Sequence, residues 1–141
     1  MDTKNAGQIA ALLNTENQLV VPYSAEKILS VSTNYLYETD EIGDVSVFIE
    51  VKKVQWYQYE FCHLTVSPNH RREGLGQLIL SKAEKFAQDN RGRILQCTIR
   101  ENNLASQALF QKSGFLNTAV FYYPDSGNNV TVWQKVISQK T

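Results

Sequence analysis

The organisation of the chain is clearest at residues 66–76, which read Val66-Ser67-Pro68-Asn69-His70-Arg71-Arg72-Glu73-Gly74-Leu75-Gly76. An apolar, strand-like run ends here, two arginines follow, and two glycines open a segment with helical periodicity. The first N–H groups of such a helix have no partner inside it, and the positive end of the helix dipole attracts anions. Glycine lets an anion approach the backbone, and arginine adds charge-assisted hydrogen bonds. The stretch therefore predicts a site for a phosphorylated small molecule.

Two other phosphate-binding patterns do not fit this chain. The Walker pattern of Gly, four residues, Gly, Lys and Ser or Thr does not occur. The dinucleotide fingerprint needs a third glycine three residues after Gly76, where Ile79 stands instead. For this stretch taken alone, an ordinary glycine-opened helix with solvated arginines remains an alternative.

The flanking sequence predicts alternating helices and strands. On the N-terminal side, we expect a helix capped by Thr3, a break at Pro22, a short helix capped by Ser24, and strands over residues 34–38, 45–56 and 59–66. On the C-terminal side, we expect a helix over 74–90, a strand over 94–99, a helix over 104–112, and strands over 118–123 and 130–137 joined by a turn at 124–129. The 141 residues suit one domain spanning 1–141.

Two spaced motifs carry a resemblance to a known family. Arg71-x-x-Gly74-x-Gly76, preceded by Val66-x-Pro68, resembles the pyrophosphate-binding motif of the GNAT N-acetyltransferase superfamily. A second motif of that family follows at the expected distance, and it comprises Asn103, Ser106, Leu109-Phe110 and Gly114-Phe115. The overall layout is similar to that of the ribosomal-protein N-terminal alanine acetyltransferases. The resemblance implies an α/β fold (three-layer α+β) with a mixed, mostly antiparallel central sheet and helices on both faces.

The resemblance also implies a cofactor and the residues that hold it. Acetyl-CoA would be the acyl donor, its pantetheine arm paired with the backbone near Leu64 and Val66. Its pyrophosphate would lie on residues 71–77, namely Arg71, Arg72, Glu73, Gly74, Leu75, Gly76 and Gln77. Asn103 would contact the cofactor near its reactive end, as would Phe110. The strands over 59–66 and 94–99 would be the family's parallel pair that splays apart at the thioester.

Glu60 is the candidate general base. A lysine-like amine with a pKa of about 10.4 needs roughly 4.6 kcal/mol to lose its proton at pH 7, so a base is expected for such a substrate. Glu60 lies six residues before Val66, which matches the catalytic glutamate of histone-type acetyltransferases, and regular alternation would place Glu60, Cys62, Leu64 and Val66 on one face. A charged residue at the solvent end of a strand is an equal alternative. His63 is a weaker candidate.

Two departures from the family concern the chemistry. Phe110 stands where many members have a tyrosine that protonates the leaving thiolate, and Thr98 stands where the ribosomal-protein enzymes have a glutamate. Tyr122 is a candidate substitute proton donor, with Tyr123 as its neighbour, although alternate faces prevent both from reaching one cleft. The CoA thiolate can also leave without an enzyme acid.

The resemblance implies an acetyl-CoA-dependent N-acetyltransferase acting on a primary amine of a small molecule, peptide or protein. A non-catalytic acyl-CoA-binding regulatory module is the alternative, motivated by Phe110 and Thr98. A nucleotide or phosphoprotein binder ranks third, because the second motif has no role in it.

Composition limits the other expectations. Fourteen basic and fourteen acidic residues give zero formal charge, which disfavours nucleic-acid binding. No apolar run is long enough to span a membrane, and Cys62 and Cys97 in apolar runs suggest a reducing, cytoplasmic setting. No His and Cys spacing suggests a metal site. The aromatic edge segments would serve a homodimer or the core equally well.

Overall fold

The computed structural model describes residues 1–17, 19 and 21–137. Its helices are α1 (Thr3–Glu16), α2 (Ala25–Ser30), α3 (Leu75–Asp89) and α4 (Leu104–Lys112), with two short 3-10 helices, η1 (Ser32–Asn34) and η2 (Pro68–His70). Its strands are β1 (Tyr35–Thr39), β2 (Val45–Gln55), β3 (Gln58–Val66), β4 (Ile94–Arg100), β5 (Leu116–Tyr123) and β6 (Asn128–Val136). The predicted order of helices and strands is confirmed.

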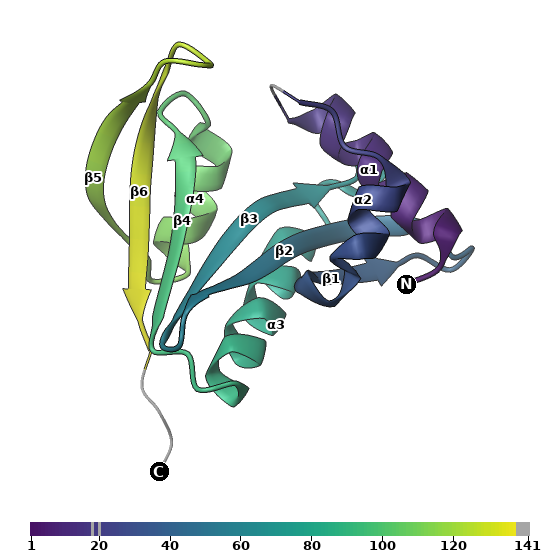
Figure 1. Ribbon diagram of the computed structural model, residues 1–141, viewed down its shortest axis with the longest axis horizontal. Helices are drawn as coiled ribbons and strands as arrows, with labels where there is room; N and C mark the ends of the chain where they lie inside the picture. The colour runs from purple at the N-terminus through teal and green to yellow at the C-terminus, as the bar shows by residue number, and fades with distance from the viewer. Residues whose placement is uncertain (18, 20, 138–141) are drawn as a thin grey trace. The chain divides into compact units, whose positions relative to one another are not determined.

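The six strands form one mixed sheet in the order β1-β2-β3-β4-β6-β5 (Figure 1). β1 runs antiparallel to β2, and β6 runs antiparallel to both β4 and β5. β3 and β4 are parallel, as predicted, with Gln58 to Glu60 opposite Ile94 to Gln96. The mixed, mostly antiparallel sheet with helices confirms the predicted fold class.

Several predicted boundaries were wrong by a few residues. The N-cap of α1 is Asp2 and not Thr3, since an Asp2 carboxylate oxygen accepts the backbone N–H of Asn5 at 2.7 Å. The last hairpin is longer than predicted, because β5 and β6 each begin two residues earlier and Tyr123 already pairs with Asn128. The N-cap of α2 is Ser24, as predicted, with its hydroxyl oxygen accepting the N–H of Lys27 at 3.1 Å.

β3 contains one residue that breaks its regular geometry. His63 has φ of 57°, the left-handed region, in the middle of the strand. A residue of this kind interrupts the alternation of side chains, as a β-bulge does. The burial of β3 nevertheless alternates on both sides of His63, with Phe61 and Thr65 buried and Glu60 and Val66 half-buried, and the shared face of Glu60 and Val66 stays a prediction.

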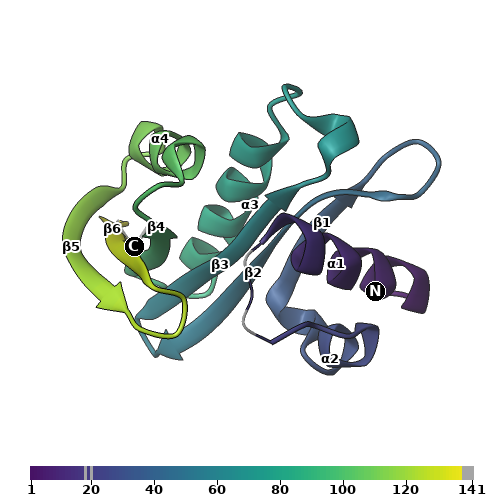
Figure 2. The same cartoon turned by 90° about the horizontal axis from the view of Figure 1, so that it is seen from above.

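Residues 1–51 and 63–83 form one compact unit. Its core joins Ile9 and Leu13 of α1, Ile28 of α2, Tyr35 of β1 and Phe48 of β2. Figure 2 shows α1 and α2 lying side by side, which agrees with the contact between these helices. Apolar residues of α1 spaced three and four apart supply this buried stripe, as expected for an amphipathic helix.

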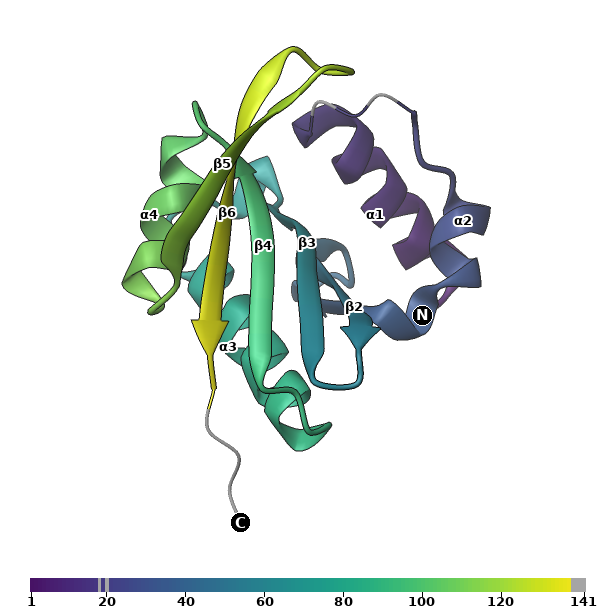
Figure 3. The same cartoon turned by 60° about the vertical axis from the view of Figure 1, so that its left-hand side comes forward.

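Residues 52–62 and those from 84 onwards form a second compact unit. The ring centroids of Phe110 and Phe115 lie 5.0 Å apart at 82°, and those of Phe61 and Phe115 lie 6.3 Å apart. This aromatic cluster joins β3 to α4 and to the residue that precedes β5. Figure 3 shows β6 between β4 and β5, which makes β5 an edge strand.

Candidate functional site

The loop between η2 and α3 has an unusual backbone. Arg72 has φ of 67° and Gly74 has φ of 75°, so two residues in this short loop are left-handed. A left-handed conformation carries no steric penalty for glycine and is uncommon for other residues. A Cβ added to Gly74 would have no heavy atom within 4 Å, so the space beside it is open.

This backbone leaves a run of N–H groups available. Within the part of the chain that the structure describes, no backbone carbonyl accepts the N–H groups of residues 71–77, whereas the next N–H, that of Leu78, donates to Gly74 at 3.1 Å. Donors before the first turn of a fifteen-residue helix, together with its dipole, form an anion site. The loop therefore offers the donors that a diphosphate would need, and its binding of a diphosphate stays a prediction.

The two arginines of the loop differ in whether their charge is already paired. Arg71 forms an ion pair with Glu16 at 2.5 Å, so its guanidinium is already engaged by the end of α1. Arg72 is exposed and has no ion pair with a described residue. Of the two arginines, Arg72 is the one whose charge is available to an incoming phosphate.

His70 lies at the end of η2, immediately before the loop. Its Nε2 lies 3.0 Å from a carboxylate oxygen of Asp40, and its Nδ1 lies 3.3 Å from a carboxylate oxygen of Glu73. The backbone N–H of Asp44 lowers the pKa of Asp40, with smaller contributions from His70 and Ile42. The side chain of His70 is 23% exposed, so the ring is half-buried between these two carboxylates.

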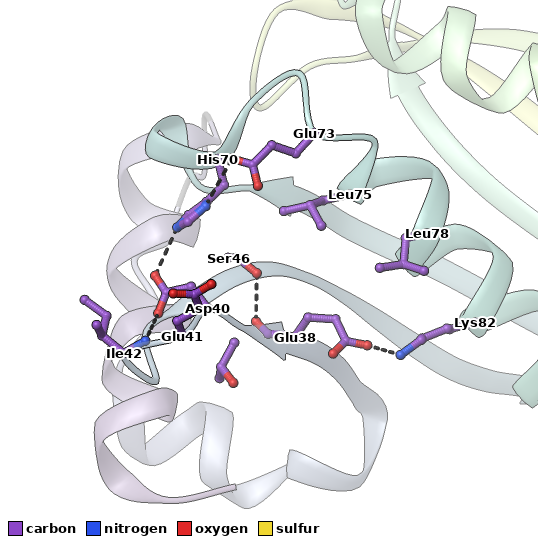
Figure 4. Close-up of a pocket in the computed structure, with 11 residues that line it drawn as sticks. Glu38, Asp40, Glu41, Ile42, Ser46, His70, Glu73, Leu75, Leu78 and Lys82 are labelled. Carbon is purple, nitrogen blue, oxygen red and sulfur yellow. Dashed lines mark hydrogen bonds and ion pairs between the residues drawn. The ribbon is translucent and has the colours of Figure 1, made fainter.

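A cavity of about 660 Å³ adjoins the loop on this side. Figure 4 shows Asp40 of the β1–β2 turn and Glu73 on either side of His70 at the wall of the cavity. Lys82 of α3 and Glu38 of β1 form an ion pair farther along the same wall. The cavity wall thus joins the β1–β2 turn to the beginning of α3 through charged side chains.

The predicted pantetheine strand lies in the same unit as the loop. Leu64 and Val66 are half-buried on β3, and Thr65 between them is buried. The side chain of Thr65 donates to the carbonyl of His63 at 2.8 Å, and the His63 ring lies edge-on to Tyr23 with centroids 5.7 Å apart. His63 is therefore packed against an aromatic ring in the first unit, while Glu60 belongs to the second.

Glu60 lies in a polar row across β3, β4 and β6. Its carboxylate accepts a hydrogen bond from the Gln96 side chain, and Gln134 donates to Gln96 at 2.6 Å. Burial raises the pKa of Glu60, and the Gln96 hydrogen bond and the charge of Lys52 oppose part of that effect. A carboxylate with a raised pKa and an ordered hydrogen bond has the properties of a general base.

A buried thiol lies beside Glu60. Burial raises the pKa of Cys97 far above its usual value, and the nearby Glu60 carboxylate and Cys62 raise it further. A thiol that stays protonated is neither a nucleophile nor a metal ligand. Cys97 therefore contributes packing and low polarity to the surroundings of Glu60.

The sheet register separates the two catalytic candidates. Glu60 lies opposite Gln96, Gln96 opposite Gln134, and Gln134 opposite Leu116, while Tyr122 is six residues beyond Leu116 on β5. Three strand steps of about 4.8 Å and six residues of about 3.3 Å, taken at right angles, place Tyr122 about 24 Å from Glu60. The structure does not bring the two side chains together, and Tyr122 is 61% exposed.

The second motif has a structural role in α4. Asn103 is the N-cap of this helix, and its side-chain oxygen accepts the N–H of Ser106 at 3.2 Å. Phe110 is 4% exposed and packs on Phe115. Both predicted cofactor residues belong to the second unit, whereas Leu64, Val66 and residues 71–77 belong to the first.

Sequence reasoning missed three features of the site. Asp40 and Gln96 reach their partners only through the turn and the strand register, and Arg71 is engaged by Glu16, 55 residues away. No short-range sequence pattern predicts which residues pair when they are so far apart in the chain. The charged residues of the 40–44 turn indicated only that charged side chains lie there.

The described residues, 1–17, 19 and 21–137, contain neither a cluster of metal ligands nor a helix that could span a membrane. No group of three His, Cys, Asp or Glu side chains there is placed to hold a metal ion. None of the helices found there has the length and apolar character needed to cross a membrane.

Comparisons with known proteins agree with the geometry. The profile of the Acetyltransferase (GNAT) family matches residues 15–115. N-acetyltransferase family 8 member 3 of Rattus norvegicus is 34% identical over 83 residues, 58% of this chain but only 36% of that protein. The match thus spans about a third of that relative's length.

Solved structures share the fold at lower identity. yncA from Salmonella typhimurium, solved with its cofactor acetyl-CoA, superposes with a TM-score of 0.84 at 18% identity, covering 100% of this chain and 93% of that one. The ribosomal-protein-S18-alanine N-acetyltransferase of Escherichia coli gives 0.78 at 19% identity, covering 100% and 93%. The predicted likeness in layout to the ribosomal-protein enzymes is confirmed.

Proposed function

The chain belongs to the GNAT acetyltransferase family, and we propose that it is an acetyl-CoA-dependent N-acetyltransferase that modifies a primary amine of a small molecule, peptide or protein. The observation that carries the proposal is the run of N–H groups over residues 71–77, which the left-handed Arg72 and Gly74 free from backbone acceptors among the described residues. Acetyl-CoA supplies the acetyl group as a thioester and carries the diphosphate that such a run would bind.

The phosphate-binding role falls mainly on the backbone. The N–H groups of Glu73, Gly74, Leu75, Gly76 and Gln77 would donate to the diphosphate oxygens, aided by the α3 dipole. The free guanidinium of Arg72 adds a charge-assisted bond, whereas Arg71 must first share or leave Glu16. Leu64 and Val66 would flank the pantetheine arm, and Asn103 and Phe110 stay candidate cofactor residues.

Glu60 is proposed as the general base. An ammonium group must lose its proton before it can attack a thioester carbonyl, and a carboxylate with a raised pKa accepts that proton more readily near neutral pH. The hydrogen bond from Gln96 fixes the orientation of Glu60, and burial supplies the raised pKa. Lys52 stabilises the ionised form and keeps the base available.

Protonation of the leaving thiolate has no assigned donor in the Glu60 row. Phe110 has no hydroxyl, and Tyr122 lies about 24 Å from Glu60 by the strand register. Since a thiolate is a good leaving group, an enzyme acid is dispensable. Tyr122 stays a candidate donor and, as an exposed ring, a candidate wall of the acceptor groove.

Coenzyme binding can be tested with two matched glycine variants. Gly74 and Gly127 both have φ near 75° and open space beside them, but Gly127 lies in the β5–β6 turn. Titration calorimetry with coenzyme A should show saturable binding by the wild type and by Gly127→Glu, and none by Gly74→Glu. Equal binding by both variants, or none by the wild type, would refute the proposal.

Catalysis needs a separate assay. Release of free CoA thiol should be measured with acetyl-CoA and a panel of amines, peptides and aminoglycosides. Glu60→Gln should reduce kcat about 100-fold with coenzyme affinity retained, since a positioned base contributes about 10² to 10⁴. Asp89→Asn, which removes an exposed carboxylate at the end of α3, serves as the control.

Phe110 and Thr98 favour one alternative, a non-catalytic acyl-CoA-binding module. It predicts coenzyme binding with no thiol release on any acceptor, and no effect of Glu60→Gln. A nucleotide or phosphoprotein binder would bind ATP or NAD in preference to coenzyme A in the same calorimeter.

Several further expectations remain predictions. The name of the rat relative supports N-acetylation, and the E. coli structure supports a peptide or protein acceptor. A single domain over 1–141, a cytoplasmic location, a homodimer, and the lack of nucleic-acid and membrane partners are still to be tested. Sedimentation of the purified chain would decide the oligomeric state.

A further inference from the structure

His70 connects two segments that are far apart in the sequence. It ends η2 immediately before the diphosphate loop, and its ring bridges Asp40 of the β1–β2 turn and Glu73 of the loop itself (Figure 4). Asp40 is fixed in turn, because its other carboxylate oxygen accepts the N–H groups of Ile42 at 3.0 Å and of Asp44 at 2.9 Å. The loop is thereby fastened to a rigid turn through one imidazole.

The two contacts of His70 cannot both be hydrogen bonds unless the ring is charged. Neutral imidazole has one N–H donor and one acceptor, whereas imidazolium has two donors. Both neighbours of the ring are carboxylates, which only accept. The 3.0 Å contact with Asp40 is a hydrogen bond, whereas the 3.3 Å contact with the more exposed Glu73 is an ion pair that loses its attraction when the ring loses its proton.

Glu73 is the one acidic residue between Arg71 and Gln77. Bound to His70, its carboxylate is turned toward the cavity wall (Figure 4). Released from His70, the carboxylate is free to compete with a phosphate for the N–H groups of its own loop or to repel it. The charge state of His70 therefore affects the anion site through Glu73.

Other charged groups around the ring do not replace this link. From β1 and the turn, Glu38 and Glu41 line the same cavity, and from α3 Lys82 pairs with Glu38. Arg71, next to His70 in the chain, pairs with Glu16. Among these groups, Lys82 is paired with Glu38 and Arg71 with Glu16, so neither cation takes the place of His70 beside Asp40 and Glu73.

We propose that His70 is a positioning residue for the diphosphate loop, and that its protonated form, held between Asp40 and Glu73, strengthens coenzyme A binding. The inference rests on the proposed function, because it assumes that residues 71–77 hold the diphosphate. Under this proposal, the affinity for coenzyme A and the KM for acetyl-CoA depend on the protonation of His70, which lies outside the polar row of Glu60.

The test compares the wild type with His70→Gln across pH. Dissociation constants for coenzyme A should be measured by calorimetry from pH 5.5 to 8.5 in both proteins. Because protonation of the coenzyme phosphates affects both equally, the ratio of the two constants isolates His70. We expect His70→Gln to bind about fivefold to tenfold more weakly at pH 5.5, the factor for one charge-assisted hydrogen bond, with the ratio falling toward unity at pH 8.5.

Two further measurements separate positioning from folding. Lys4→Gln removes the Lys4–Asp44 ion pair of the same turn without touching His70, and it should bind as the wild type does. At saturating acetyl-CoA, His70→Gln should keep the wild-type kcat and show only a raised KM. In the wild type, NMR should show the His70 titration midpoint rising when coenzyme A is added, by the linkage of proton and ligand binding.

The outcomes for the two proposals are distinct. A wild type that binds no coenzyme A refutes the proposed function. A wild type that binds, with an affinity ratio to His70→Gln that is the same at every pH, refutes the positioning role alone. If His70→Gln does not fold, an unchanged His70 midpoint in the wild type with and without coenzyme A refutes that role equally.

Discussion

The burial of Glu60 favours its proposed role as a general base but lowers the stability of the folded protein once the carboxylate is ionised. Its carboxylate is half-buried, and burial raises its pKa above the ordinary 4.5. Between that value and the folded pKa, the native state binds more protons than the unfolded state does. Stability from this residue is therefore fully present at low pH and falls as the pH rises through that interval.

Replacement by glutamine should remove this loss. Glu60→Gln keeps the shape and the hydrogen-bonding partners without the charge, so we expect its free energy of unfolding to exceed that of the wild type by a margin that grows from pH 4.5 to pH 8. Urea denaturation at several pH values measures the margin. Asp89→Asn should show no such trend, and a margin that shrinks with pH would contradict the burial argument.

Thr131 presents a buried polar pair of a different kind. Its hydroxyl donates to the carbonyl of Ile99 at 2.7 Å and accepts the indole N–H of Trp133 at 2.8 Å, with both side chains buried. Thr131→Val leaves the buried indole N–H of Trp133 without this acceptor and removes one of the bonds to the Ile99 carbonyl, in nearly the same volume. We expect a loss of about 2 kcal/mol, measured by urea unfolding.

A matched control for this change lies on the edge strand. Thr118 is exposed, and its hydroxyl donates to the carbonyl of Val132 at 3.2 Å. Thr118→Val should alter stability by less than about 0.5 kcal/mol. If the two variants lost the same amount, the buried hydroxyl of Thr131 would have no special role.

The junction of α3 and β4 depends on one close approach. The N–H of Gly92 donates to the carbonyl of Ala87 at 2.7 Å, and Tyr59 packs over the same point. A Cβ added to Gly92 would lie 2.8 Å from a Tyr59 ring carbon and 2.9 Å from the Ala87 oxygen, which is backbone. The turn therefore admits no side chain without a shift of the helix end.

Gly92→Ala should destabilise the protein by about 1–3 kcal/mol, as overpacking does. Thermal unfolding measures it, and Gly7→Ala is the control. Gly7 lies inside α1 with no atom within 4 Å of its added Cβ, so alanine there should raise stability by about 0.5–1 kcal/mol. Opposite signs for two glycine-to-alanine changes are the expected result.

At the scale of the whole molecule, coenzyme binding should raise the stability of the protein, and the candidate cofactor residues are distributed over two compact units. Leu64, Val66 and residues 71–77 belong to one unit, and Asn103 and Phe110 belong to the other. A ligand that binds only the folded state stabilises it by about 2.7 kcal/mol at 100 times its dissociation constant. For a chain of this length, that corresponds to a rise in Tm of roughly 10 °C.

Hydrogen exchange should locate that stabilisation. With acetyl-CoA bound, amides of residues 71–77 and of residues 103–110 should both exchange more slowly than in the free protein. Slower exchange in the first segment alone would mean that the second motif acts only as the helix cap seen at Asn103.

The sequence was sufficient for the order of helices and strands and for the glycine-containing loop at Gly74, and the family resemblance of its two motifs was sufficient for the parallel pairing of the two central strands. These depend on short-range properties, namely periodicity, glycine conformations and the spacing of two motifs, all of which lie within one stretch of chain. The sequence predicted Thr3 as the N-cap of α1, whereas the structure has Asp2. Both residue types are favoured N-caps, so local preference alone does not choose between these neighbours.

Tertiary structure determined which side chains meet. The left-handed His63, the engagement of Arg71 by Glu16, the bridge from His70 to Asp40, and the distance between Glu60 and Tyr122 all follow from strand register and from contacts between remote segments. A one-residue change in the pairing of β3 with β4 would turn Glu60 away from Gln96, and contacts such as Arg71 with Glu16 depend on how remote segments pack, which no local pattern in the sequence fixes.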